Sequence, residues 1–175
     1  MLIRAADHVR DASACAAIYA PFVADTAVSF ESVPPTADEF AARIERMAAT
    51  HAFLVAVDDD GTLAGFAYGC PHRERAAYRW AAEVSVYLGD GFRGRGVGTA
   101  LYGELLPLLA RRGYQIALAG VGLPNDASLA LHRACGFEPV GTYRRIGWKA
   151  GRWHDVTWLA LDLIPATGAP PAEPQ

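Results

Sequence analysis

The sequence lacks several features that would assign a chain of this size to a function. Its three cysteines, Cys15, Cys70 and Cys135, are odd in number and far apart, and no Cys-x-x-Cys occurs. Neither a disulfide framework nor a zinc ribbon is therefore predicted. The five histidines include no His-Glu-x-x-His spacing, so we expect no catalytic metal. Lys149 is the only lysine, which excludes a P-loop, because that motif needs Gly-Lys-Ser/Thr.

Charge and hydropathy exclude further classes. The net charge of −3 gives no basic excess for binding nucleic acid. No apolar run approaches the ~18 residues that a membrane span requires. The first twelve residues have no apolar signal-peptide core, so we expect a cytoplasmic protein. With 175 residues, 52% of them hydrophobic, the chain is expected to form one globular domain.

The most informative stretch is residues 83–112, which predicts a strand, a glycine-rich turn and a helix. In residues 83–88, alternation places Val84, Val86 and Leu88 on one face of the strand. Glu83, Ser85 and Tyr87 then lie on the other face. After the turn, apolar residues recur at helical spacing, namely Val97, Leu101, Leu105, Leu108 and Leu109.

The turn between them, residues 93–98, has the composition of an anion site. A helix start offers unpaired backbone N–H groups and a partial positive charge. Glycines let an anion approach the backbone, and the two arginines add directed donors. We therefore predict a phosphate or pyrophosphate site, the alternative being a plain turn with two solvated arginines. A Rossmann fingerprint fails because Thr99 stands where its last glycine belongs.

Patterning along the rest of the chain predicts the order β-α-α-β-β-β-α-β-α-β-β. We expect Asp11 to cap the first helix and Pro21 to bend or end it. Thr36-x-x-Glu39 matches a capping box at the start of the second helix. Pro107 is expected to kink the central helix or to divide it. This order predicts an α+β fold with one mixed β-sheet flanked by helices over residues 1–164. The Pro- and Ala-rich residues 165–175 are expected to form a disordered tail.

Two motifs resemble the GNAT N-acetyltransferase family. Arg93-x-x-Gly-x-Gly98 fits the loop that binds the acetyl-CoA pyrophosphate there. Residues 125–137, which begin with Asn125 and end in Gly-Phe, resemble the family's second signature. The resemblance covers nearly the whole chain up to Asp162, and the predicted topology agrees with the GNAT fold. Residues 28–30, 77–80, 121–126 and 151–156 are similar more specifically to phosphinothricin and methionine sulfoximine N-acetyltransferases.

The resemblance implies acetyl-CoA as cosubstrate and a homodimer. It implies that backbone groups of Val86, Tyr87 and Leu88 pair with the pantetheine arm. The pyrophosphate would be held by Arg93, Gly94, Arg95, Gly96, Val97 and Gly98. Asn125 and Ser128 would lie near the thiol end of the cofactor.

Catalysis of amine acetylation calls for a general base, and Glu83 is the best candidate. It is the only acid in the central strand and has apolar neighbours, so partial burial would make it a stronger base. It also aligns with the glutamate given this role in phosphinothricin acetyltransferases. The alternative is a glutamate paired with Arg79. His132 stands where many GNAT enzymes have a tyrosine, and it is either the general acid for the CoA thiolate or a packed helix histidine.

Candidate acceptor-binding residues surround this strand in the sequence. Arg73 and Arg75 could grip a phosphinate or carboxylate with planar forks of donors, or be exposed charges. Aromatic candidates for the pocket wall, any of which could instead belong to the core, are Phe30, Tyr78 and Trp153.

The function predicted from these residues is transfer of the acetyl group of acetyl-CoA to the amino group of a small amino-acid analogue. Phosphinothricin and methionine sulfoximine are the expected acceptors, which would make the protein a herbicide- or antibiotic-resistance enzyme. Other acceptors remain open: methionine sulfone, an arsinic amino-acid analogue or a polyamine. A non-catalytic acyl-CoA-binding sensory module is the alternative from another class.

Overall fold

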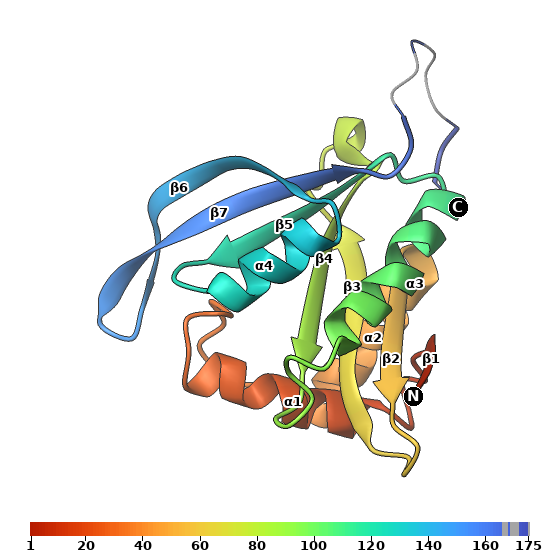
Figure 1. The fold of residues 1–175 in the computed structure, drawn as a ribbon, viewed down its shortest axis with the longest axis vertical. Helices are drawn as coiled ribbons and strands as arrows, with labels where there is room; N and C mark the ends of the chain where they lie inside the picture. Colours follow the sequence, from red (N-terminus) through yellow and green to blue (C-terminus); the bar gives the residue numbers. More distant parts are fainter. Residues whose placement is uncertain (166–167, 169–171, 175) are drawn as a thin grey trace.

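The computed structural model describes residues 1–165, 168 and 172–174. Its centre is a seven-stranded mixed sheet with the strand order β1-β2-β3-β4-β5-β7-β6 (Figure 1). All neighbouring strands are antiparallel except β4 and β5, which are parallel. The strands are β1 (Leu2–Ala5), β2 (Ala52–Val57), β3 (Leu63–Pro71), β4 (Ala81–Leu88), β5 (Ile116–Gly122), β6 (Glu138–Lys149) and β7 (Arg152–Asp162).

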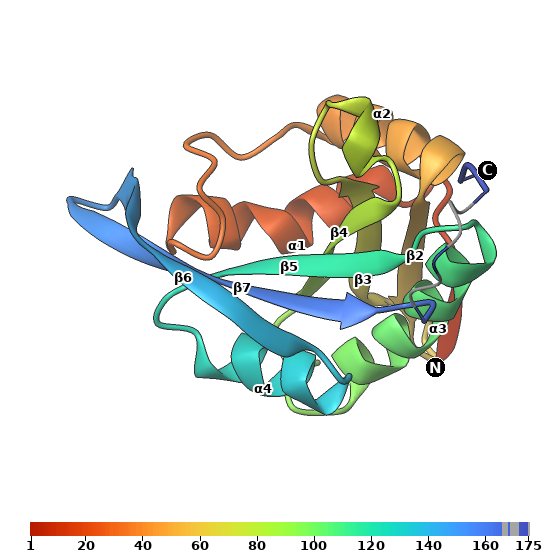
Figure 2. The ribbon, with the colours of Figure 1, turned by 90° about the horizontal axis from the view of Figure 1, so that it is seen from above.

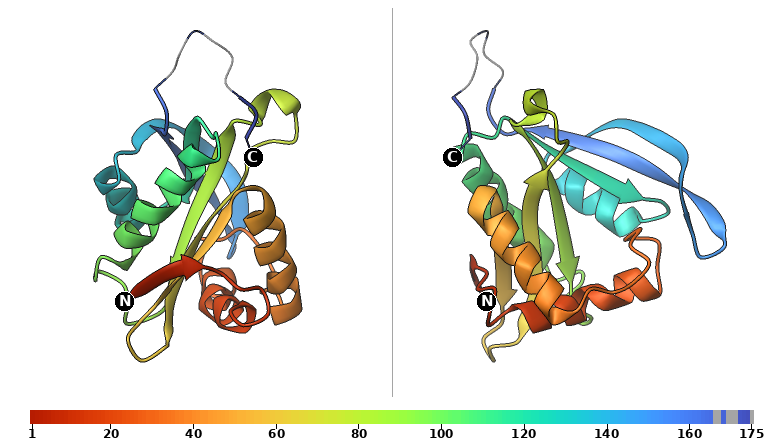
Figure 3. Two further views of the ribbon diagram at one scale, coloured as in Figure 1. Left: turned by 90° about the vertical axis from the view of Figure 1, so that its right-hand side faces the viewer. Right: turned by 180° about the vertical axis from the view of Figure 1, so that it is seen from behind.

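Four α-helices cover the two faces of this sheet. The helices are α1 (Ala12–Ala24), α2 (Ala37–Thr50), α3 (Val97–Arg111) and α4 (Asp126–Ala134), and a short 3-10 helix, η1, spans Ala76–Tyr78. Helices α1 and α2 lie on one side of the sheet, and α3 and α4 lie on the other (Figure 2). Helix α2 packs along β2 and β3, as Figure 3 shows from behind. The expected α+β fold and element order are confirmed.

The alternation predicted for β4 separates two hydrophobic cores. Val84, Val86 and Leu88 face the core beneath α3, where Leu101 and Leu105 are fully buried. Tyr87 packs into the other core, beneath α1 and α2. Because β4 contributes to both cores, its backbone is fixed from both sides, and it provides a rigid base for the residues that project from it.

Strands β4 and β5 pair only at their first residues and then separate. Their parallel register runs from Ala81↔Ile116 to Glu83↔Leu118, although both strands continue well beyond it. The divergence is visible in Figure 1. In the described part of the chain, the edge of β4 beyond Glu83 that faces β5 therefore has no strand partner. Backbone N–H and C=O groups on that edge are available to a ligand.

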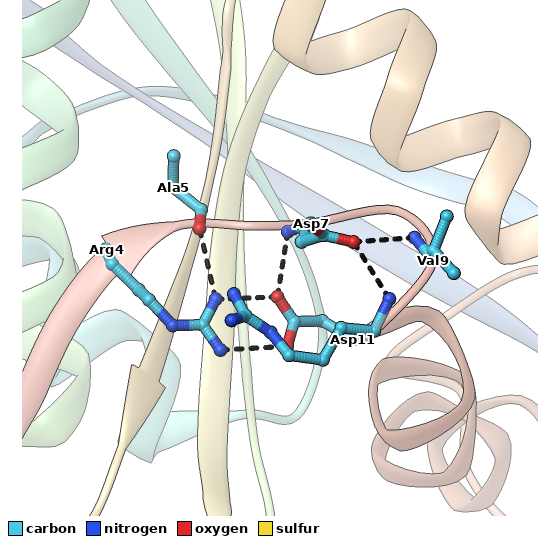
Figure 4. Close-up of polar contacts among 6 residues, drawn as sticks. Arg4, Ala5, Asp7, Val9 and Asp11 are labelled. Atoms are coloured by element: carbon cyan, nitrogen blue, oxygen red, sulfur yellow. Dashed lines mark hydrogen bonds and ion pairs between the residues drawn. The ribbon is translucent and has the colours of Figure 1, made fainter.

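Asp11 does not cap α1 in the way that the sequence predicts. It occupies the N-cap position, but its side chain makes no capping hydrogen bond. The buried carboxylate instead accepts two hydrogen bonds from Arg4, at 2.6 and 2.8 Å, and others from Arg10 and the Asp7 N–H (Figure 4). Burial alone would raise the pKa of Asp11, but these donors outweigh it and hold the pKa well below its usual range.

The prolines in two helices interrupt neither of them. Pro21 lies inside α1, which continues to Ala24, so the prediction that it could end the helix is wrong. Pro107 lies inside α3, which runs unbroken from Val97 to Arg111, so the central helix is not divided. Packing of both helices against the sheet offsets the hydrogen bond that each proline removes.

The predicted capping box at the start of α2 is confirmed. The Thr36 side chain accepts from the Glu39 N–H, and the Glu39 carboxylate accepts from the Thr36 N–H. Of the predicted disordered tail, residues 166–167, 169–171 and 175 lie outside the described residues. The Trp80 Nε1–H donates to the Ala172 carbonyl oxygen at 2.8 Å, and Arg79 pairs with Glu173, so the described part of the tail contacts the residues that precede β4.

Candidate active site

An apolar cavity with a volume of about 530 Å³ lies at the N-terminus of α3. One wall is the glycine-rich turn with the first residues of α3, and another is the end of α1, including Phe22. Val86 and Leu88 line the cavity from β4, and Asn125 and Ser128 line it from the start of α4. The cavity therefore joins the glycine-rich start of α3 to the free edge of β4.

The glycines of this turn are required by its backbone. Gly91, Gly94 and Gly96 have φ values of +85°, +72° and +78°, in the left-handed region that disfavours other residues. Gly96 is the N-cap of α3 and has no side chain to satisfy the first N–H groups of the helix. These N–H groups are thus available to an anion such as a pyrophosphate. Arg93, which stacks over Phe22 at 5.0 Å, adds a positive charge at the wall.

A second cavity of about 610 Å³ lies on the other side of the opening between β4 and β5. Glu83, Ser85 and Tyr87 line it from β4, and Gly120 and Gly122 line it from β5. The rest of the wall comes from α1, the loop between α1 and α2, the loop after β3, and the β6–β7 hairpin. Its residues are Tyr19, Val28, Ser29, Phe30, Glu31, Arg73, Tyr143, Ile146, Val156 and Trp158. It combines two carboxylates, one guanidinium and several aromatic rings, which suits a small charged acceptor.

Glu83 has one occupied and one free carboxylate oxygen in this cavity. Its Oε1 contacts His72 Nδ1 at 2.7 Å and Arg73 NH1 at 3.3 Å. Within the described residues, Oε2 has no hydrogen-bond partner. The expected alternative partner, Arg79, pairs with Glu173 instead. His72 is held edge-on between Tyr78 and Trp158, with ring centroids 5.7 Å away in each case. The carboxylate is thus oriented from one side and left free on the other.

A small cavity of about 50 Å³, here called the channel, lies at the opening in the sheet and shares wall residues with both larger cavities. Val84, Ser85 and Tyr87 line both the channel and the cavity of about 610 Å³. Asn125 and Ser128 line both the channel and the cavity at α3. The Asn125 Oδ1 accepts from the Ser128 N–H at 3.1 Å and caps α4, which fixes this end of the channel. A thioester entering from one cavity can therefore meet an amine entering from the other.

His132 lies at the wall of the channel, but both of its ring nitrogens are occupied. Nδ1 lies 2.7 Å from the Ser128 carbonyl oxygen, so this nitrogen carries the proton. Nε2 must then accept the hydrogen bond from the Tyr102 hydroxyl, at 3.0 Å. Burial lowers the pKa of His132, although the contact with Ser128 opposes the effect. A neutral, fully bonded imidazole is a poor direct acid.

The loop of residues 25–31 forms part of both large cavities and is held by the chain's only lysine. Lys149 Nζ donates to the carbonyl oxygens of Val23 and Ser29, each at 2.6 Å. Burial lowers the pKa of Lys149, while nearby Glu31 opposes that effect. The end of β6 is thereby connected to the segment that carries Phe30 and Glu31.

Most of the predicted site residues line these spaces. All the predicted cofactor residues except Arg95 line the α3 cavity or the channel. Arg95 turns back to the Gly91 carbonyl oxygen. Among the predicted acceptor residues, Phe30 and Arg73 line the larger cavity.

The other three predicted acceptor residues lie outside the cavity walls. Arg75 is exposed at the start of η1. Tyr78 reaches the site only through its edge-on contact with His72. Trp153 packs against Trp148 near the tip of the β6–β7 hairpin and is 56% exposed.

Four residues at this site were not predicted from the sequence: His72, Glu31, Tyr19 and Trp158. His72 had a usable signal, because it directly follows a strand whose antiparallel partner carries Glu83 (Cys70↔Glu83). Glu31, Tyr19 and Trp158 had no such signal in the sequence. They come from a loop, from helix α1 and from strand β7, which only the folded chain brings together.

Comparison with known protein families identifies the class to which this chain belongs. The model of the acetyltransferase (GNAT) domain matches residues 3–158, so the chain belongs to the GNAT acetyltransferase family. It is an acetyl-CoA-dependent N-acetyltransferase. The described residues include no cluster of three or more His, Cys, Asp or Glu side chains suited to a metal ion, and no described helix has the length and hydropathy of a membrane span.

The chain is similar over most of its length to several characterised N-acetyltransferases. It is 36% identical over 161 residues to the phosphinothricin N-acetyltransferase of Streptomyces viridochromogenes, covering 91% of this chain and 87% of that protein. It is 34% identical to the L-methionine sulfoximine/L-methionine sulfone acetyltransferase of Pseudomonas aeruginosa, covering 93% and 95%. A phosphinothricin acetyltransferase from Sinorhizobium meliloti, solved with acetyl-CoA, superposes with a TM-score of 0.92 at 34% identity, covering 98% and 93%.

Proposed function

We propose that this chain acetylates the α-amino group of a small amino-acid analogue, with Glu83 as general base. The observation that carries the proposal is Glu83 in the wall of the cavity of about 610 Å³, beside residues that also line the channel, with an Oε2 that has no hydrogen-bond partner among the described residues. The relatives named for phosphinothricin, methionine sulfoximine and methionine sulfone support this acceptor class. The acceptor would enter the cavity of about 610 Å³, and acetyl-CoA would occupy the one at α3.

The proposed reaction is a direct attack. An α-amino group is mostly protonated near pH 7, so a base must remove one proton before or during attack. The amine nitrogen bonds to the thioester carbon as its proton passes to Glu83, directly or through one water. A backbone N–H of β4 near Tyr87 stabilises the oxyanion. The C–S bond then breaks, and the CoA thiolate takes up the second proton that the attacking nitrogen must lose, so that CoA and the acetylated product both leave neutral at these atoms.

We assign His132 a positioning role in this reaction. With Nδ1–H committed to Ser128 and Nε2 accepting from Tyr102, the imidazole has no free proton for the thiolate. Its contribution is to hold the Tyr102 hydroxyl at the wall of the channel, where Tyr102 is also a lining residue.

Two further features of the enzyme belong to the proposal. The exposed β6–β7 hairpin carries large apolar side chains, including Ile146, Trp148 and Trp153, which are 55–61% exposed. A second copy of this chain covering them would form the homodimer, and sedimentation equilibrium tests it: a monomer at micromolar concentration contradicts it.

Three free cysteines suit a reducing compartment, and we propose the cytoplasm.

The test of the function is thiol release from acetyl-CoA with four acceptors: phosphinothricin, methionine sulfoximine, methionine sulfone and spermidine. We expect release with at least one of the first three. Release with spermidine alone would keep the chemistry and discard the acceptor class. Silence with all four, while acetyl-CoA still binds in calorimetry, would favour a sensory acyl-CoA-binding module.

The role of Glu83 is tested by Glu83→Gln. Loss of a general base lowers kcat by about 10²–10⁴-fold. We expect acetyl-CoA binding to be unchanged, because Glu83 does not line the α3 cavity. The matched control is Glu74→Gln, an exposed glutamate in the loop that precedes β4, which should keep full activity. A Glu83→Gln enzyme with wild-type kcat would refute the assignment.

A further inference from the structure

The acceptor cavity contains a second carboxylate, Glu31, that the proposed reaction does not use. Glu31 lies in the loop between α1 and α2 and lines the cavity with its neighbours Ser29 and Phe30. Arg43 of α2 binds it with two parallel hydrogen bonds, NH1 to Oε1 and NH2 to Oε2, each 2.7 Å long. The Tyr19 hydroxyl donates to Oε1 at 2.8 Å. Three donors from two helices therefore fix the orientation of this side chain.

The same contacts keep Glu31 ionised. The hydrogen bonds from Arg43 hold the pKa of Glu31 below its ordinary value, although burial opposes them. The pKa of Arg43 is raised, chiefly by its hydrogen bonds to Glu31, so both partners indicate one stable ion pair. An ionised carboxylate accepts hydrogen bonds and cannot donate one. Oε2 receives only the Arg43 bond from the described residues, so it keeps an acceptor position for a ligand.

Glu31 and Arg73 lie near opposite ends of the acceptor cavity. Arg73 contacts Glu83 at the start of the open part of β4. Glu31 is bonded to Tyr19, whose ring packs edge-on against Tyr87 at 4.8 Å. Glu83 and Tyr87 are four residues apart on one strand, a separation of roughly 13 Å. An amino acid whose carboxylate pairs with Arg73 can therefore extend its side chain along β4 toward Glu31, which lines the same cavity.

We propose that Glu31 is a specificity-determining residue that selects acceptors whose side chain ends in a hydrogen-bond donor. This inference rests on the proposed function and ranks the acceptors that it leaves open. Methionine sulfoximine, methionine sulfone and phosphinothricin all end in a tetrahedral sulfur or phosphorus centre of similar size. The sulfoximine presents an N–H group, the sulfone only neutral oxygens, and phosphinothricin a negatively charged oxygen. Glu31 can accept from the first, has nothing to accept from the second, and repels the third.

The first test is the kcat/KM of the wild-type enzyme with these three acceptors. A hydrogen bond to a charged group is worth about tenfold or more in kcat/KM, so we expect the sulfoximine to exceed the sulfone by at least that factor. Phosphinothricin should be the poorest of the three. Equal values for sulfoximine and sulfone, or a preference for phosphinothricin, would overturn the inference.

Variants at position 31 separate selection from folding. In Glu31→Gln the amide can donate to an oxygen, so the sulfoximine-to-sulfone ratio should fall to within about threefold. Glu31→Asp keeps the charge and should keep the preference for the sulfoximine. The matched control is Glu45→Gln, an exposed glutamate of α2, which should leave all three values unchanged. Thermal melting verifies that each variant is folded, and an unchanged ratio in folded Glu31→Gln would refute the role.

A failure of the proposed function is distinguishable from a failure of this inference. If no acceptor supports thiol release, the proposed reaction is wrong, yet calorimetric binding of the sulfoximine and the sulfone to the enzyme with CoA still measures their ratio. If all three acceptors react at similar rates, the reaction stands and the role of Glu31 is refuted.

Discussion

Replacing His51 with phenylalanine should make the protein more resistant to acid. His51 follows α2 and is only 4% exposed. Its ring stacks on Tyr114 with centroids 4.5 Å apart, and Nδ1 contacts the Thr50 hydroxyl at 2.8 Å. Burial lowers the pKa of His51 from 6.5 to about 4, and the charge of Arg112 contributes to the shift. The folded protein therefore binds a proton at this site less readily than the unfolded chain does.

The sign and size of the effect follow from that difference. Above pH 6.5 the imidazole is neutral in both states and contributes no pH dependence. As the pH falls from 6.5 toward 4, the unfolded chain takes up the proton first, and the free energy of unfolding drops by about 1.4 kcal/mol per pH unit. Near pH 4 this one side chain should have cost about 3 kcal/mol.

Urea denaturation at pH 7, 5.5 and 4.5 measures the effect. Phenylalanine keeps the stack on Tyr114 and cannot be protonated, so His51→Phe should lose less stability over this range than the wild type does. Carboxylates such as Asp11, whose pKa is lowered, also destabilise the fold in acid, but they act equally in both proteins. His8→Phe, at an exposed position, is the control and should follow the wild type. Parallel curves for His51→Phe and wild type would refute the reasoning.

Two further substitutions test the acceptor cavity and the N-terminal ion pairs. A methyl group added in Gly147→Ala would lie 2.2 Å from Phe30 Cε2 and displace that half-exposed ring, so the acceptor KM should rise several-fold while the KM for acetyl-CoA stays constant. Gly141→Ala, where an added methyl group meets nothing within 4 Å, is its control in steady-state kinetics. Asp11→Asn removes the buried charge that Arg4 faces and should cost about 2–3 kcal/mol in urea denaturation at pH 7. A change below 0.5 kcal/mol would contradict the structural importance of that ion pair.

Features that depend on neighbouring residues were predictable from the sequence. The capping box of Thr36 and Glu39 is local, and it forms as expected. The glycine-rich turn before α3 and the alternation along β4 are also local sequence patterns. They position one wall of the α3 cavity and Glu83. Asp11 shows the limit, because a long-range partner, Arg4, competes successfully for a carboxylate that the local pattern assigns to the helix.

The acceptor site could be predicted only in part, because its walls come from distant segments. Arg73 and Arg75 are equivalent in the sequence, yet only Arg73 lines the cavity, whereas Arg75 is exposed at the start of η1. Likewise, Trp153 and Trp158 lie on one strand, but Trp158 lies over Gly120 of β5 whereas Trp153 is beyond the last pair of β5 and β7. Which of two nearby residues lines the cavity depends on where the strands pair, and no local sequence pattern specifies that pairing.

The single lysine has a consequence for an enzyme that works beside a reactive thioester. Acetyl-CoA slowly modifies neutral lysine amines on protein surfaces, and most proteins of this size present many of them. This chain presents one, Lys149, and its nitrogen is held between the carbonyl oxygens of Val23 and Ser29. The enzyme therefore offers its own cosubstrate a single lysine amine, and that amine is already engaged by two carbonyl oxygens.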